Sequence, residues 1–182
     1  MKKVLSLIIS LFFAQAAFAY ETVLVDFPPN QGWHSVCYQA QADEAILQYV
    51  PAGQDETNWT RSLIFHSYKN LNWTDSAAAF MDRATMQMEM RNSSQHYKYI
   101  KYNEMDSIAT RCVQKNALIP TQCEFYRVSK SHEGLISMHY INKDVNNFKS
   151  TYNYWYQIIQ DIRIYTSYYR TDRIMDKATS FE

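Results

Sequence analysis

Glycine is scarce in this sequence, and its scarcity excludes a large class of ligand sites. Only 3 of the 182 residues are glycine. Loops that cradle a phosphate or a dinucleotide need several closely spaced glycines, because the backbone must approach the ligand without a Cβ in the way. No segment has that spacing, so we expect no nucleotide cofactor.

An excess of charge of either sign is also lacking. The 18 Lys and Arg residues balance the 18 Asp and Glu residues. Strong attraction to nucleic acid or to an anionic membrane surface depends on a positive excess. We therefore expect no nucleic-acid partner.

Recognisable catalytic motifs are missing as well. His132-Glu133 begins like the zinc-protease motif HExxH, but the fifth position is Ile136. There is no GxSxG turn for a nucleophilic serine and no CxxC pair. Of the five scattered histidines, His66 and His139 are the two that could meet on one face of a predicted sheet. We assign no catalytic, cofactor-binding or metal-ligating residue.

The one long hydrophobic run lies at the N-terminus. Lys2 and Lys3 precede the apolar run Val4–Phe13, and Ala17–Ala19 forms a small-x-small cleavage site. This layout is typical of a secretory signal peptide, and the run is shorter than the roughly 20 residues of a membrane anchor. We predict a signal peptide over residues 1–19. The mature chain is then expected in the periplasm or secreted, without membrane insertion.

Cysteine is limited to three residues. Cys112 and Cys123 flank a ten-residue loop and lie on two predicted strands. If those strands pair, the two cysteines lie opposite each other, and a disulfide would contribute about 3 kcal/mol. This bridge, with Cys37 left over, is our prediction. The alternative is three reduced cysteines buried as small hydrophobic residues.

Beyond residue 19, strand and helix patterns alternate along one domain, residues 20–169, followed by a charged tail, residues 170–182. Strands are predicted at 23–27, 35–40, 45–50, 59–68, 96–102, 107–113 and in the segment 122–141. Helices are predicted at about 75–91 and 148–169, the first capped by Thr74 or Asp75. The order predicts an α+β fold, a mainly antiparallel sheet with helices packed on one face.

The segment Gln122–Ile141 is the most clearly patterned. It predicts a hairpin with Ser131–Glu133 as its loop and Gly134 closing the turn at positive φ. This register separates a buried face from a solvent-exposed face. The predicted buried set is Glu124, Tyr126, Val128, Ile136, Met138 and Tyr140. The predicted exposed set is Arg127, Ser129, Ser137 and His139.

Each predicted helix has an apolar stripe. In the last helix the stripe is Phe148, Tyr152, Trp155, Ile159 and Ile162, which we expect to dock on the buried face of the hairpin. In the first helix it is Ala77, Met81, Ala84 and Met88, with Met86 and Met90 elsewhere around the helix. These methionines are interpreted mainly as core filling. An adaptable binding surface or copper ligation is the alternative.

Several short motifs resemble those of a known group of proteins. They are Tyr49–Pro51, Asn58–Thr60, Glu124–Val128, Gly134–Tyr140 and Trp155. Together they resemble a loose group of uncharacterised exported proteins of Gram-negative bacteria with an α+β domain similar to the Mog1/PsbP-like fold. The resemblance implies a fold and an exported location, and it implies no reaction.

Two functions fit the sequence. The first is an exported, non-enzymatic protein that binds a protein partner, because fifteen tyrosines and four tryptophans accompany the missing catalytic motifs. The alternative is a small secreted hydrolase with a site on the exposed sheet face, built from His66, His139 and nearby carboxylates. Convergence of both histidines and a carboxylate in one concave pocket would favour the hydrolase.

Overall fold

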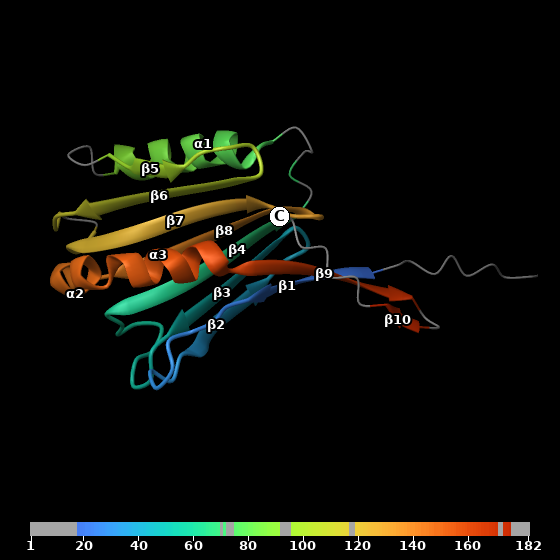
Figure 1. Ribbon diagram of the computed structural model, residues 1–182, viewed down its shortest axis with the longest axis horizontal. Helices are drawn as coiled ribbons and strands as arrows, with labels where there is room; N and C mark the ends of the chain where they lie inside the picture. The colour runs from blue at the N-terminus through green and yellow to red at the C-terminus, as the bar shows by residue number, and fades with distance from the viewer. Residues whose placement is uncertain are drawn as a thin grey trace, which may run out of the picture.

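The computed structural model describes residues 18–69, 71, 75–91, 96–116, 119–170 and 173–175. All but the last two residues of the predicted leader, and most of the predicted tail, therefore lie outside the described residues. The strands are β1 (Phe18–Leu24), β2 (His34–Ala40), β3 (Glu44–Val50), β4 (Arg61–Lys69), β5 (Lys98–Lys101), β6 (Asp106–Val113), β7 (Gln122–Lys130), β8 (Gly134–Asn142), β9 (Arg163–Arg170) and β10 (Arg173–Met175). The helices are α1 (Ala77–Met90), α2 (Val145–Ser150) and α3 (Tyr152–Asp161) (Figure 1).

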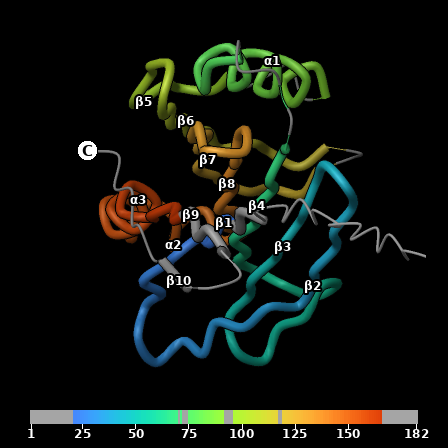
Figure 2. Tube along the Cα trace, turned by 90° about the vertical axis from the view of Figure 1, so that its right-hand side faces the viewer, coloured from blue at the N-terminus to red at the C-terminus, as the bar shows by residue number. Residues whose placement is uncertain are grey.

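The predicted α+β class is confirmed. Seven antiparallel strands form the main sheet in the order β2-β3-β4-β8-β7-β6-β5, and a smaller sheet has the order β1-β9-β10. The helices, however, pack on both faces of the main sheet, whereas we expected one. α1 lies over β6 and β7, and α2 and α3 lie over β7 and β8 on the opposite side (Figure 2).

The hairpin β7–β8 exists, but its predicted register is wrong by one residue. Tyr126 lies opposite His139, and Arg127 lies opposite Met138. The turn is shorter than expected, because Ser131 N donates to Gly134 O. Gly134 does not adopt positive φ. Its hydrogen side chain is needed because a Cβ there would lie 2.0 Å from Tyr68 O on β4.

The predicted division of the hairpin into one dry and one wet face is also wrong, because helices cover both. Phe125, Met138 and Tyr140 join one core with α2 and α3. Tyr126 and Val128 join a second core under α1. β7 is therefore buried along almost its whole length, which explains why apolar residues fall on both of its faces.

The last helix is half as long as predicted. α3 ends at Asp161, and the residues from Arg163 form β9, which pairs antiparallel with β1. β-branched and aromatic residues dominate this segment, and such residues favour strands when a partner is available. The predicted stripe is nevertheless correct: Phe148, Trp155, Ile159 and Ile162 are buried, and Tyr152 packs against them.

α1 matches its prediction except at its N-terminus and at two of its methionines. Met81 and Met88 belong to the core under α1, but the core-filling interpretation is wrong for Met86 and Met90, which are 57% and 72% exposed. Ser76, not Thr74 or Asp75, is the N-cap residue, and its Oγ accepts a hydrogen bond from Ala79 N at 3.1 Å. Asp75 forms an ion pair with Arg83 instead, at 2.8 Å. The core side of α1 is the predicted stripe, in which Ala77 and Met81 are fully buried.

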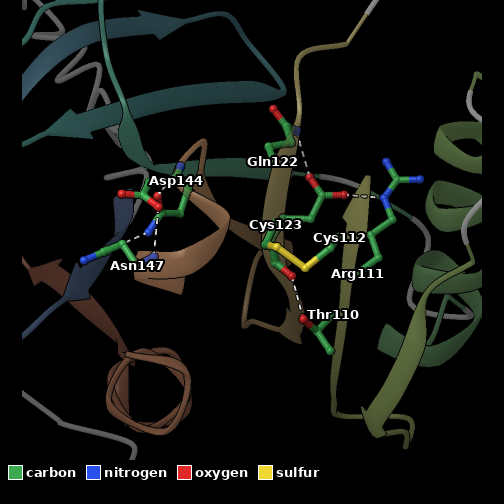
Figure 3. Close-up of a disulfide and its surroundings, with 9 residues drawn as sticks. Thr110, Arg111, Cys112, Gln122, Cys123, Asp144 and Asn147 are labelled. Carbon is green, nitrogen blue, oxygen red and sulfur yellow. Dashed lines mark hydrogen bonds and ion pairs between the residues drawn. A yellow bond between two sulfur atoms is a disulfide. The ribbon is translucent and has the colours of Figure 1, made fainter. Parts of the chain in front are cut away.

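The predicted disulfide is present. Cys112 on β6 and Cys123 on β7 are directly opposite each other and are bridged (Figure 3). Cys37 on β2 is unbridged. The bridge joins the ends of two neighbouring strands next to the core under α2 and α3. It closes the loop between β6 and β7, which restricts the unfolded chain.

Candidate functional site

Among the described residues, the most deeply buried charged side chain is that of Glu124, on the α1 face of β7. Its side chain is 1% exposed and accepts four hydrogen bonds. Arg111 Nε donates at 2.5 Å, His139 Nε2 at 2.9 Å and Gln122 Nε2 at 3.2 Å, and the Tyr97 hydroxyl donates a further short bond. Arg111 and Gln122 reach it from β6 and from β7 itself (Figure 3).

The electrostatics of this cluster keep the carboxyl group ionised. Burial acts to raise the pKa of Glu124, but His139, and then Arg111 and Tyr97, lower it to about 2. Burial, followed by the charge on Glu124, raises the pKa of Tyr97 well above its ordinary value. Glu124 therefore only accepts and Tyr97 only donates. With four donors already in place and no solvent access, the carboxylate cannot act as a general base on a substrate.

The two histidines singled out from the sequence lie on the same face of adjacent strands. His139 is opposite Ile64, and His66 is opposite Ser137, so the two rings are diagonal neighbours. Each has its own carboxylate: His66 Nε2 lies 3.2 Å from Glu44 Oε2, and His139 bonds Glu124. No set of three or more potential metal ligands gathers anywhere in the described ranges.

A second charged cluster lies on the opposite face, below the end of α3. Asp106 Oδ1 accepts from Arg127 Nε at 2.7 Å and from Ser129 Oγ at 2.6 Å, and Asp106 Oδ2 accepts from Lys101 Nζ at 2.8 Å. Burial acts to raise the pKa of Asp106, but Arg127, followed by Lys101 and Ser129, holds it below its ordinary value. Arg127, which the sequence placed on a solvent-exposed face, thus lies under a helix.

This cluster forms part of the wall of a cavity of about 680 Å³. The cavity lies where α3 passes into β9, and it is also lined by the β5–β6 loop and the β7–β8 turn. Its size is within the range of small-molecule sites. Neither His66 nor His139 lines it. The two predicted histidines and a carboxylate therefore do not converge in this cavity.

A third feature is an exposed surface shared by α1 and β5, which we call the α1–β5 surface. It consists of Met86, Met90, Tyr99 and Tyr102, whose exposed fractions range from 40% to 72%. Met86 and Met90 are one turn apart on α1 and follow Asp82 on the same stripe. Asp82 accepts hydrogen bonds from both tyrosine hydroxyls, which ties the helix to the strand beside it.

The sequence contained a signal for both buried charge clusters. Charged residues within otherwise apolar strands must be paired, because an unpaired buried charge is very costly. Glu124 and Arg127 on β7, and Arg111 on β6, meet this description. Most of their partners could not be found from local patterns, because they come from neighbouring strands or, for Arg127, from the end of α3.

Comparisons with protein families, with curated proteins and with solved structures give no match for this chain. The resemblance to exported proteins with a Mog1/PsbP-like domain therefore stays a prediction. Among the described residues, no helix is both long enough and apolar enough to cross a membrane.

Proposed function

We propose that this chain is an exported protein that acts by binding a partner protein through the α1–β5 surface. The N-terminal leader pattern supports export. The Cys112–Cys123 disulfide supports it as well, because such bridges persist mainly in the periplasm and outside the cell.

The observation that carries the binding proposal is the chemistry and order of the α1–β5 surface. Tyrosine and methionine are enriched at protein interfaces. Tyr99 and Tyr102 are held in place: their rings lie 5.2 Å apart edge to face, and their hydroxyls bond Asp82 at 3.0 and 2.5 Å. Aromatic side chains that are already ordered lose less conformational entropy on binding. The flexible Met86 and Met90 beside them can adapt to a partner's shape.

The hydrolase alternative has less support. A histidine acting as a general base must reach both a substrate and an orienting group. His139 and His66 each have an orienting carboxylate, Glu124 and Glu44. Neither histidine lines the cavity of about 680 Å³ on the other face of the sheet, so that cavity does not supply them with a substrate site.

The test is affinity capture with purified residues 20–182 from the envelope and medium of the native host. A Met86→Lys, Tyr102→Lys variant should lose capture of the partner by at least about tenfold, because two charges would be placed in an apolar contact. Tyr38→Lys is the matched control, since Tyr38 is 70% exposed on β2, at the opposite edge of the main sheet. Equal capture by the wild type and the double variant would refute the proposal. So would a partner lost only with Tyr38→Lys.

A further inference from the structure

The two outer strands of the main sheet differ in how well they are protected from pairing with another chain. An edge strand carries a row of unpaired backbone groups, which proteins usually protect with short length, lysine, proline or a bulge. β5 has four residues, and two of them are Lys98 and Lys101. β2 has seven residues, HSVCYQA, without lysine, proline or a carboxylate. It lies at the edge of the sheet away from α1 (Figure 1 and Figure 2) and is the less protected of the two.

A β-bulge protects the first half of β2. The register with β3 shifts between Ser35 and Cys37, and bulges bend an edge away from an incoming strand. From Cys37 to Ala40 the register with β3 is regular. Tyr38, Gln39 and Ala40 are exposed, Tyr38 to 70%. This second half is the part of the edge that another strand can reach.

The direction of the backbone groups at this edge follows from the turn between β2 and β3. Gln41 N donates to Glu44 O at 2.8 Å, and hydrogen-bonded pairs alternate with non-hydrogen-bonded pairs along an antiparallel ladder. The N–H and C=O groups of Tyr38 and Ala40 therefore point away from β3. In the described part of the chain, β3 is the one strand hydrogen-bonded to β2. Tyr38 and Ala40 thus present their backbone groups to an incoming strand.

This part of the edge is complementary to itself. When two copies of β2 pair antiparallel about a two-fold axis at Gln39, Tyr38 of each copy lies opposite Ala40 of the other. Each such pair can exchange two backbone hydrogen bonds. The exposed Tyr38 ring then covers the small Ala40 side chain across the strands. The two Gln39 side chains face each other, and an amide group can both donate and accept.

The charges beside β2 also fit an antiparallel copy. The end at the β2–β3 turn is acidic, with Asp43 and Glu44. The other end lies next to Arg61, whose Nη1 donates to Gln31 Oε1 at 2.9 Å and whose guanidinium lies 5.9 Å from the centre of the Trp33 ring. Antiparallel pairing brings the acidic end of each copy toward the basic end of the other, and such complementarity selects the orientation of a complex.

We propose that the protein forms a two-fold symmetric dimer in which the main sheet continues from β2 of one copy into β2 of a second copy. An interface of this kind uses the same surface on both copies, so it closes with two. The α1–β5 surface lies at the other edge of the main sheet. The dimer is therefore independent of the partner binding proposed above.

The experiment is sedimentation velocity of the purified, disulfide-bonded mature protein between about 10 µM and about 1 mM, the range of weak to moderate complexes. The wild type should shift from monomer to dimer as its concentration rises. Gln39→Lys and Gln39→Glu should each weaken dimerisation by about fivefold, because two like charges would lie opposite each other at the axis. An equimolar mixture of these two variants should dimerise at least as well as the wild type, because the charges in the mixed dimer are opposite.

Two further variants test the edge itself and a different surface. Ala40→Pro should abolish dimerisation, because proline lacks the N–H group that points toward the second copy. Met86→Lys, Tyr102→Lys is the control and should dimerise like the wild type. Near-ultraviolet circular dichroism verifies that each variant is folded, and the exposed Gln39 position keeps the test valid if the proline variant does not fold.

Four results would overturn the proposal. They are a wild type that stays monomeric, a charge variant at Gln39 that dimerises like the wild type, a mixture that associates no better than its components, and a dimer lost in the Met86→Lys, Tyr102→Lys control. The assay contains the purified protein alone, so its outcome is separate from capture of a partner protein through the α1–β5 surface.

Discussion

Replacing Glu124 with glutamine should destabilise the protein strongly and in a way that depends on pH. The substitution keeps the shape of the side chain and removes its charge. Arg111, whose side chain is 3% exposed, is then left buried without a counter-ion. Breaking a buried pair by removing one partner costs about 3–5 kcal/mol. We expect a loss of this size in the free energy of unfolding at pH 7.

The pH dependence follows from the pKa of Glu124. Its ordinary value is 4.5, and the folded protein lowers it to about 2. This difference corresponds to about 3 kcal/mol of stability. Because the folded-state pKa is the lower one, the contribution is complete above about pH 5 and is lost as the pH falls toward 2. The Glu124→Gln variant has no carboxyl group at this position. The difference in free energy of unfolding between wild type and variant should therefore narrow by about 2 kcal/mol between pH 7 and pH 3.

The assay is urea unfolding followed by tryptophan fluorescence, with the disulfide intact, at pH 7, 5, 4 and 3. Glu44→Gln is the control, because its pair with His66 is largely exposed and should contribute less than about 1 kcal/mol. A loss below about 1 kcal/mol for Glu124→Gln at pH 7, or a gap that stays constant down to pH 3, would refute the reasoning. The double variant Glu124→Leu, Arg111→Met should recover much of the loss, since no buried charge remains.

Three other outcomes are expected. Trp155→Ala should lower the free energy of unfolding by about 3–5 kcal/mol in the same assay, because the ring is 1% exposed and stacks on Tyr140. Tyr154→Ala should lower it by well under about 1 kcal/mol, because Tyr154 is 49% exposed. Equal losses would show that the wrong side of α3 had been assigned to the core. Gly134→Ala should cost about 1–3 kcal/mol, because its Cβ would overlap backbone atoms of β4, and a melting temperature like that of the wild type would contradict this contact. Mass spectrometry should show that the mature exported protein begins at Tyr20, and a mature form that retains the leader would disprove cleavage. Under non-reducing conditions, Cys37 should be the one cysteine that is alkylated.

Local sequence patterns were sufficient for most element types. They were insufficient for the hairpin register and for the helix-or-strand choice at residues 163–170, because both depend on distant partners. The hairpin was placed correctly, but its register depended on whether Gly134 takes positive φ or allows close contact. Only the position of Tyr68 on β4 decides between these two, and β4 lies far away in the sequence. A one-residue error of this kind moves every side chain to the other face.

The same limitation explains the candidate sites. The residue pattern of 163–170 is compatible with both a helix and a strand. This segment forms a strand because it pairs with β1. The cavity depends on where α3 ends, so it could not be predicted while that helix was extended to residue 169. His66 and His139 were placed on one face correctly. Their separate carboxylates depend on the cross-strand register, which the sequence alone did not give.

The pairing of β1 with β9 makes the last steps of folding non-local. β1 precedes every other described strand, and β9 follows all seven strands of the main sheet. During synthesis from the N-terminus, β1 cannot pair with β9 until nearly the whole described chain has been made. Val23 and Ile164, which pack against the core from these two strands, arrive together only then. Contacts between such distant segments slow folding, so the α3 face of the main sheet is the last to be covered completely.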